Sequence, residues 1–141
     1  MQTEEQDIHP GEVSHPLRVL VVEDSVNMQL ALRELVSAAG DAEVVGVVHS
    51  ETLAMDWADA NRGSWDLAIV DLTLAEGDGF NIVRHLKEQQ ECGTVVVFSG
   101  YVTDVIRRHC SALGADAVFH KTESSDLARF VEELSDRPAS S

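Results

Sequence analysis

Five short apolar runs alternate with longer amphipathic segments along the chain, and this alternation leaves few folds open. The runs cover residues 17–22, 43–48, 66–70, 94–98 and 116–119. The first run is apolar apart from Arg18, as expected for a strand that is covered on both faces. The pattern therefore predicts five largely buried β-strands.

The segments between the runs have the spacing of amphipathic helices. In the first of them, Met28, Leu32 and Leu35 recur with a period near that of a helix, and Gly40 follows where a C-terminal cap belongs. Helices are expected over residues 25–39, after the N-cap Ser50, and over 78–88, 102–113 and 125–134. The later helices are expected to turn inward Leu53, Ala54, Trp57 and Ala58; Phe80, Val83 and Leu86; Val105, Ile106 and His109; and Leu127, Phe130, Val131 and Leu134.

The alternation predicts an α/β fold, a (βα)5 doubly wound parallel sheet with helices on both faces. A Rossmann order and the flavodoxin-like strand order 2-1-3-4-5 both remain open on the pattern alone. The 141 residues suit one domain, which we place at residues 17–135. Residues 1–16 are expected to form a flexible acidic leader, and residues 136–141 a disordered tail.

Polar side chains follow four of the five expected strands. Glu23 and Asp24 follow the first strand, Asp71 the third, Ser99 the fourth and Lys121 the fifth. In the flavodoxin-like order these strands are neighbours, so all five side chains would meet at the carboxyl edge of the sheet. That order is the one we predict.

These residue types together suit phosphoryl transfer. Three clustered carboxylates repel one another unless a cation binds them, and their oxygens favour Mg²⁺ or Mn²⁺. The Ser99 hydroxyl and the Lys121 ammonium can contact phosphoryl oxygens, and Asp71 can act as a carboxylate nucleophile. Taken singly, each residue is as well explained by a helix cap or an ordinary surface position. The combination on the correct strands favours the site.

Charge and composition limit the classes of partner that the protein can bind. The formal net charge is −15, with 10 basic against 25 acidic residues, which disfavours binding to nucleic acid and to anionic membranes. No apolar run is long enough to span a bilayer, and the acidic N-terminus does not resemble a signal peptide. Two cysteines suggest reduced, incidental thiols rather than a disulfide framework. We expect a cytoplasmic protein.

The sequence resembles the response-regulator receiver domains of two-component signalling. The resemblance covers roughly residues 17–134. It is carried by VLVVEDS around Glu23 and Asp24, LAIVDLTLAEGDGF around Asp71, VVVFSG up to Gly100 and GADAVFHK up to Lys121.

The resemblance implies a role for each site residue. Asp71 would be the phosphoacceptor. Asp24 and Asp71 would bind Mg²⁺ directly together with the carbonyl of Thr73, and Glu23 would act through a water molecule. The remaining implied roles are those of Ser99 as the switch hydroxyl, Lys121 as the phosphoryl contact, Gly79 in the turn before the third helix, and Thr73 and Tyr101 as residues that tune access of water.

Two positions depart from the family pattern. Thr122 follows the lysine where the family usually has proline. The family's aromatic switch position holds Val118, and Phe119 comes one residue later. Output coupling is therefore assigned to Val118, Phe119 and Gly100, with movement expected mainly in the loop after Ser99 and in the helix that follows it.

The resemblance also implies partners. The phosphoryl group would come from a histidine kinase or a histidine phosphotransfer protein. No output domain is recognisable after residue 134, so we expect signalling by docking on another protein, or draining of phosphate from a kinase. The expected docking face is formed by the helix over 102–113, the strand over 116–119 and the helix over 125–134. A homodimer could form through the same face.

Alternative functions remain at this point. A Mg²⁺-dependent phosphatase with an aspartate nucleophile needs a second aspartate two residues later, where this chain has Thr73. A phosphate-independent binding module would need none of the strand-end residues. A nucleotide-binding flavodoxin-like protein is disfavoured because no glycine-rich loop follows the first strand. We therefore expect no enzyme activity beyond the protein's own phosphotransfer and dephosphorylation.

Overall fold

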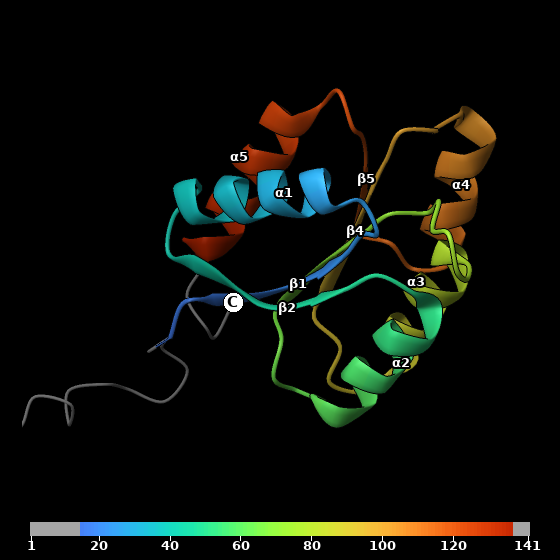
Figure 1. Cartoon of the computed structure of the whole chain (residues 1–141), viewed down its shortest axis with the longest axis horizontal. Helices are drawn as coiled ribbons and strands as arrows, with labels where there is room; N and C mark the ends of the chain where they lie inside the picture. Colours follow the sequence, from blue (N-terminus) through green and yellow to red (C-terminus); the bar gives the residue numbers. More distant parts are fainter. Residues whose placement is uncertain (1–14, 137–141) are drawn as a thin grey trace, which may run out of the picture.

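A computed structural model describes residues 15–136, and within them the five strands and five helices alternate as expected (Figure 1). The expected leader lies outside the described residues except for its last two positions, and the expected tail except for its first. The elements are β1 (Leu17–Val22), α1 (Val26–Ala38), β2 (Ala42–Val48), α2 (Glu51–Ala60), β3 (Leu67–Val70), α3 (Gly79–Glu88), β4 (Thr94–Ser99), α4 (Asp104–Ala112), β5 (Ala117–His120) and α5 (Ser124–Ser135).

The strands form one parallel sheet in the order β2-β1-β3-β4-β5. This confirms the flavodoxin-like order and excludes the Rossmann order that the sequence pattern had left open. The order makes β1, β3, β4 and β5 consecutive neighbours, so the residues that follow these strands emerge at one edge of the sheet.

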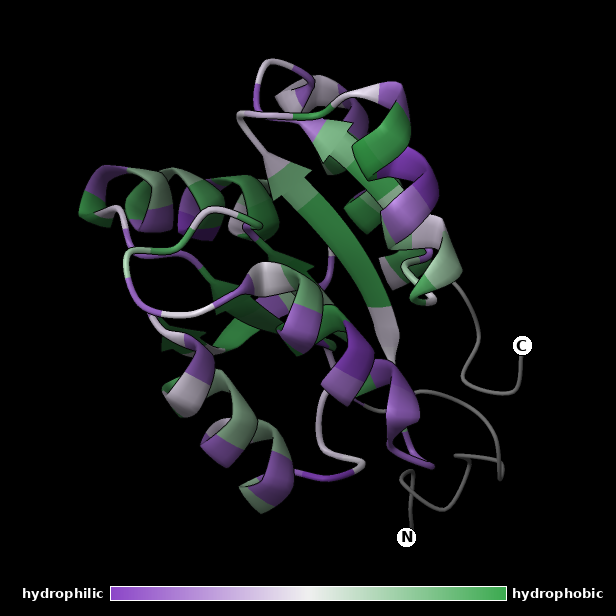
Figure 2. Ribbon diagram, turned by 90° about the vertical axis from the view of Figure 1, so that its right-hand side faces the viewer, coloured by the Kyte–Doolittle hydropathy of each residue, from purple (hydrophilic) through white to green (hydrophobic). Residues whose placement is uncertain are grey.

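The sheet separates two hydrophobic cores. One packs β-strand residues such as Leu20 and Val70 against α2, α3 and α4, and the other packs residues such as Val21 and Ile69 against α1 and α5. Figure 1 shows α1 and α5 together on one face and the other three helices opposite. Every residue of β3 is buried, as expected for a central strand covered on both faces, and Figure 2 shows the apolar strands between helices with polar outer surfaces.

Side-chain caps fix where the helices begin. Ser25, Ser50, Asp78 and Thr103 each accept a hydrogen bond from a backbone N–H in the first turn of α1, α2, α3 and α4. The Thr103 cap explains why α4 starts at Asp104 and not at residue 102, where the sequence pattern placed it.

Three of the inward positions expected from the sequence are wrong. Val105 is 66% exposed, His109 is also exposed, and Leu53 is 41% exposed. In α4 the expected inward position of Ile106 is confirmed, and the second core contact comes from the buried Cys110, which was not expected. Ile106 and Cys110 are four residues apart and share a helix face, and Val105 and His109 are rotated away from that face toward solvent.

The fifth strand also differs in its limits. It runs over Ala117–His120 and not over 116–119. Asp116 directly precedes the strand: its backbone N–H donates to the Val95 carbonyl oxygen, and its carboxylate accepts from the Val95 N–H and from Lys87 Nζ. The shift places His120 at the end of the strand, directly before Lys121.

Gly79 begins α3 in close contact with the backbone that follows β3. An added Cβ at this position would collide with the carbonyl oxygen of Asp71 and would lie 2.6 Å from the Leu72 Cα. These are backbone atoms, which cannot move aside as the end of a flexible side chain can. Only glycine allows this approach, which brings the start of α3 against the end of β3.

Substitution of Gly79 by alanine is expected to lower the free energy of unfolding by about 2 kcal/mol, in the range of other overpacking substitutions. Gly100→Ala is the matched control, because an added Cβ there has only Lys121 Cδ nearby, at 3.9 Å. Urea denaturation of both variants checks the difference. Equal stability of Gly79→Ala and wild type would contradict the close approach.

Candidate functional site

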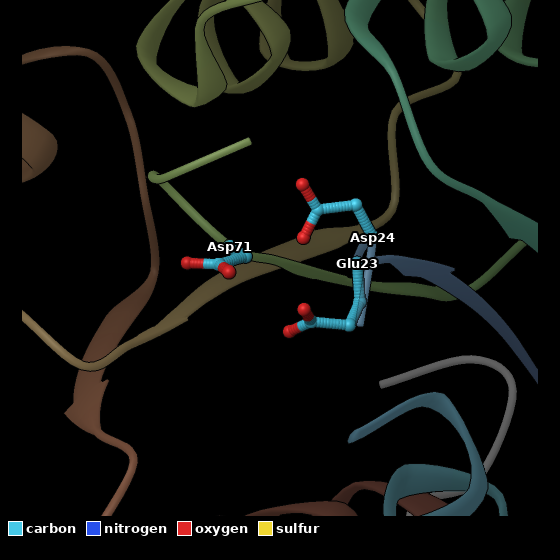
Figure 3. A group of neighbouring side chains, drawn as sticks. All are labelled: Glu23, Asp24 and Asp71. Carbon is cyan, nitrogen blue, oxygen red and sulfur yellow. The ribbon is translucent and has the colours of Figure 1, made fainter. Parts of the chain in front are cut away.

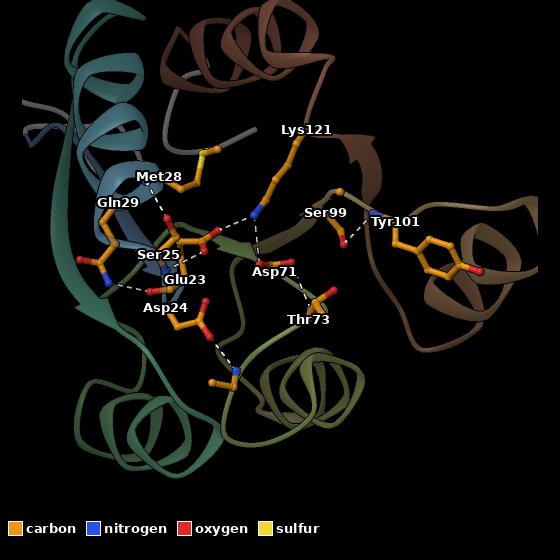
Figure 4. Close-up of polar contacts among 12 residues, drawn as sticks. Glu23, Asp24, Ser25, Met28, Gln29, Asp71, Thr73, Ser99, Tyr101 and Lys121 are labelled. Carbon is orange, nitrogen blue, oxygen red and sulfur yellow. Dashed lines mark hydrogen bonds and ion pairs between the residues drawn. The ribbon is translucent and has the colours of Figure 1, made fainter.

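The carboxyl edge of the sheet collects the polar residues singled out in the sequence. Glu23 and Asp24 follow β1, Asp71 follows β3, Ser99 is the last residue of β4, and Lys121 follows β5. The backbone N–H of Lys121 donates to the Ser99 carbonyl oxygen at 2.9 Å, which joins the ends of β4 and β5. Figure 4 shows these side chains arranged around Asp71.

Three carboxylates converge at the centre of this edge. Glu23, Asp24 and Asp71 each offer one oxygen atom within 4.8 Å of the others (Figure 3). Glu23 is 1% exposed and Asp71 is 4% exposed, whereas Asp24 is half-buried. Two negative charges are thus buried side by side, a costly arrangement unless cations lie close.

One cation in the site comes from the protein itself. Lys121 Nζ lies 3.1 Å from Asp71 Oδ2 and 3.1 Å from Glu23 Oε1. Burial disfavours its charged form, but the bonds and charges of the two carboxylates outweigh burial and raise the pKa of Lys121. Lys121 therefore stays protonated at neutral pH and offsets one of the three carboxylate charges.

Glu23 is held by the start of α1. Its Oε2 accepts a hydrogen bond from the Ser25 backbone N–H at 3.0 Å, and its carbonyl oxygen accepts one from Gln29 Nε2 at 2.7 Å. Burial raises the pKa of Glu23 above its usual value, although the bonds to Ser25 and Lys121 oppose this. The raised pKa means that the folded protein resists a full negative charge here.

The β3–α3 loop closes over the same carboxylates. The backbone N–H of Thr73 donates to Asp71 Oδ1 at 3.1 Å, and the backbone N–H of Ala75 donates to Asp24 Oδ2 at 2.6 Å. The loop is tied in turn to α2, because the Asp78 backbone N–H donates to Glu51 Oε1 at 2.8 Å. Sequence reasoning missed the Ala75 contact, since a backbone donor leaves no mark in the residue types.

Ser99 is fully buried beside the site, whereas its neighbour Tyr101 is 67% exposed. The Ser99 Oγ accepts a hydrogen bond from the Tyr101 backbone N–H at 3.3 Å. This contact orients the hydroxyl through the first residues of the β4–α4 loop. The Tyr101 side chain takes no part in this contact. Thr73, the other residue expected to tune access of water, is also exposed.

Val118 and Phe119 point to opposite faces of the sheet, as the alternation along a strand requires. Val118 is buried in the core formed with α2, α3 and α4. Phe119 packs on the other face against Phe130 of α5, with ring centroids 5.8 Å apart. Arg107 Nη1 of α4 donates a hydrogen bond to the Val118 carbonyl oxygen at 2.8 Å and so joins α4 to β5. The sequence did not predict this contact.

The donor set fits a hard divalent cation. The three converging ligand atoms are carboxylate oxygens, and the carboxylates outnumber the one ammonium group beside them. Mg²⁺ prefers oxygen ligands and commonly keeps water and substrate oxygens among them. The residues at this edge of the sheet therefore suit a Mg²⁺ ion and a phosphoryl group together.

Comparisons with known proteins point to one family. The family described as "Response regulator receiver domain" matches residues 19–132. A protein-glutamate methylesterase/protein-glutamine glutaminase from Pseudomonas fluorescens is 32% identical over 120 residues, which are 84% of this chain and 31% of that protein. The response regulator protein VraR from Staphylococcus saprophyticus is 27% identical over 84% of this chain and 56% of its own length. The chain thus spans about a quarter to a third of the methylesterases it matches, and about half of VraR.

Solved structures agree on the fold. The response regulator domain of Thermotoga maritima CheB matches with a TM-score of 0.75 at 18% identity, over 87% of this chain and 98% of that one. A receiver domain from Colwellia psychrerythraea matches with a TM-score of 0.76 at 22% identity, over 86% and 99% of the two chains. No helix among the described residues is long and apolar enough to cross a membrane.

Proposed function

The chain belongs to the response regulator receiver family, and we propose that Asp71 is the phosphoacceptor through which this receiver acts as a switch. One observation carries the proposal. Asp71 is buried at the end of the central strand, in contact with the ammonium group of Lys121 and beside two more carboxylates. This is the surrounding that a carboxylate needs to accept a phosphoryl group and to hold it.

A Mg²⁺ or Mn²⁺ ion would be held by the carboxylates of Glu23, Asp24 and Asp71 and by the carbonyl of Thr73. The convergence of three carboxylate oxygens within 4.8 Å supports this assignment. A divalent ion bound there would offset the charge of the phosphoryl oxygens. The family in general uses such an acidic pocket for Mg²⁺, and the assignment of individual ligands in this chain is part of the proposal.

The proposed reaction forms one bond and breaks one. A carboxylate oxygen of Asp71 attacks the phosphorus of a phosphohistidine, a P–O bond forms, the P–N bond breaks, and the released imidazole keeps the electron pair. Lys121 already touches Asp71 and would neutralise a phosphoryl oxygen, and the Ser99 hydroxyl would donate to another. Later attack of water on the aspartyl phosphate releases inorganic phosphate and restores the carboxylate.

A histidine kinase or a histidine phosphotransfer protein would supply the phosphoryl group, as receivers in general require. Signal output would pass to a downstream protein docked on the face of α4, β5 and α5. A homodimer would form through the same face. The alternative is that the chain only drains phosphate from a kinase. We also propose a cytoplasmic location and residues 17–135 as the receiver domain. The composition, with a formal charge of −15, supports a role without nucleic-acid contacts.

The chain is proposed to catalyse nothing beyond its own phosphotransfer and dephosphorylation. Several relatives are named as methylesterases, but this chain matches only 26% and 31% of the length of two of them. Against a phosphatase with turnover, Thr73 stands where a second catalytic aspartate would be needed, and it is exposed. Steady hydrolysis of p-nitrophenyl phosphate that depends on Asp71 would favour the phosphatase instead.

Incubation with acetyl phosphate and Mg²⁺ tests the proposal directly. The intact protein should gain one phosphoryl group by mass spectrometry, and EDTA should prevent the gain. Hydroxylamine should remove it, because an acyl phosphate reacts with this nucleophile whereas a serine phosphate does not. A protein that stays unmodified with Mg²⁺ and an acyl phosphate donor would contradict the assignment.

A beryllofluoride mimic of the phosphoryl group is expected to shift the amide signals of residues 100–110 most strongly among residues remote from Asp71. The Ser99 hydroxyl would turn toward the mimic and lose its contact with the Tyr101 N–H, which moves the loop and α4. Val118 is too short and too stiff to make an aromatic swing, so it should keep one rotamer. Nuclear magnetic resonance with and without the mimic checks both points. A rotamer change at Val118 with a quiet α4 would contradict this output route.

A further inference from the structure

The imidazole ring of His120 spans the two loops that flank the proposed phosphorylation site. His120 Nε2 lies 3.1 Å from the carbonyl oxygen of Gly100 in the β4–α4 loop. On the other side of the ring, Nδ1 lies 3.1 Å from the backbone nitrogen of Thr122 and 2.8 Å from the Thr122 hydroxyl. The ring thus touches the residue after Ser99 and the residue after Lys121.

These contacts determine which ring nitrogen donates and which accepts. A backbone N–H can only donate, so Nδ1 accepts from Thr122 and carries no proton. A carbonyl oxygen can only accept, so Nε2 carries the proton and donates it to Gly100. The contacts therefore require the Nε2–H tautomer of His120, in which both ring nitrogens are hydrogen-bonded.

The backbone around His120 forms a closed turn. The Glu123 backbone N–H donates to the His120 carbonyl oxygen at 2.7 Å, and the Glu123 carboxylate accepts from the His120 backbone N–H at 2.8 Å. Lys121 is the second residue of this turn. Its direction therefore depends on a turn that contains Thr122 in place of a rigid proline, and the ring of His120 is bonded across that turn.

We propose that His120 is a positioning residue for phosphoryl transfer, which holds the Lys121 turn against the Ser99–Gly100 segment. The lysine side chain has four flexible carbons, and its amine reaches Asp71 only if its backbone is held in place. The same ring transmits displacement of Gly100 to Lys121, so that hydroxyl and ammonium move together. This inference rests on the proposed roles of Asp71 and Lys121.

Three substitutions divide the ring's two functions. His120→Phe keeps a planar ring and removes both hydrogen bonds. His120→Gln retains an amide donor at the reach of Nε2, toward Gly100, and His120→Asn retains an acceptor near the position of Nδ1, toward Thr122. His49→Phe is the matched control, because His49 is an exposed histidine after β2, at the opposite edge of the sheet from β5, and makes no side-chain hydrogen bond to another described residue.

Two quantities are measured for each variant: the Mg²⁺ dissociation constant and the rate of phosphorylation by acetyl phosphate. His120→Phe should slow phosphorylation about tenfold, because small displacements of a positioned group cost large factors in rate. It should not weaken Mg²⁺ binding, because the proposed metal ligands lie after β1 and β3 and the displaced Lys121 is a cation that competes for two of them. His120→Gln should recover part of the rate, and His49→Phe should match wild type.

An unchanged rate in His120→Phe would overturn the proposal, and so would a parallel loss of rate and Mg²⁺ affinity, which would show general damage to the site. A long-range ¹H–¹⁵N spectrum provides a test without phosphate: the Nε2–H tautomer of His120 supports the bridge and the Nδ1–H tautomer refutes it. Wild-type protein that binds Mg²⁺, shows the Nε2–H tautomer and still takes no phosphate would contradict the proposed function and not the bridge.

Discussion

Asp71→Asn is expected to abolish phosphorylation of the protein by acetyl phosphate in the presence of Mg²⁺. The amide has the shape of the carboxylate but no anionic oxygen to attack phosphorus. Asp71 is 4% exposed, and its two oxygens are held by the Thr73 N–H and by Lys121 Nζ, a pair of contacts that orients this carboxylate. The gain of mass in the intact protein should vanish in this variant.

Asp56→Asn serves as the control for the loss of one acidic side chain. Asp56 is exposed on α2, away from the three converging carboxylates, and this variant should take up phosphate like wild type. Circular dichroism should show that Asp71→Asn is folded, because the substitution changes no volume in the core. A folded Asp71→Asn protein with wild-type phosphate uptake would mean that another side chain is the nucleophile.

Asp24→Asn is expected to abolish the response of the protein to Mg²⁺. In wild type, Mg²⁺ at ten times its dissociation constant should add about 1.4 kcal/mol to the free energy of unfolding. One Asp24 oxygen accepts from the Ala75 N–H, which an asparagine oxygen can also do, so the loop contact survives while the negative charge is lost. Removing one of three clustered carboxylates should also make the metal-free protein more stable.

Thermal unfolding with a Mg²⁺ titration measures both effects. The melting temperature of wild type and of Asp56→Asn should rise with Mg²⁺, and that of Asp24→Asn should start higher and stay constant. A melting temperature that rises equally in Asp24→Asn and wild type would remove Asp24 from the metal site. A fall in metal-free stability would show that the favourable contacts of the Asp24 carboxylate outweigh its repulsion by the other two carboxylates.

Much of the fold could be predicted from the sequence because burial on both faces marks the central strands clearly. β3 shows this well: its four residues are apolar and all are buried. The strand order could not be derived from the pattern alone, because every order of a doubly wound sheet needs the same buried strands. Only the chemistry of the residues that follow β1, β3, β4 and β5 favoured one order, and the structure has that order.

Helix faces were harder to predict than strands. In α4 the prediction holds for Ile106 but fails for Val105 and His109, because the helix packs through Ile106 and Cys110. In a short helix with several small and polar residues, apolar spacing alone does not determine which side meets the sheet. Leu53 shows the same limit in α2, where Ala54 and Ala58 lie against the core.

The site residues follow from residue type and strand position, but their connections do not. Nothing in the sequence shows that the Ala75 N–H would bond Asp24 or that Arg107 would reach the Val118 carbonyl. These bonds use backbone groups, which every residue carries. The contacts of His120 could likewise not be predicted, since they depend on where the Gly100 carbonyl lies after folding.

Peptide mapping tests most directly whether Asp71 is the residue that carries the phosphoryl group. Wild-type protein is treated with acetyl phosphate and Mg²⁺ and then with borohydride, which reduces an aspartyl phosphate to homoserine. Tandem mass spectrometry of the peptide that contains Asp71 should place the reduced residue at position 71, and EDTA should prevent its formation. Reduction at position 24, or a stable phosphate on a histidine, would contradict the role of Asp71.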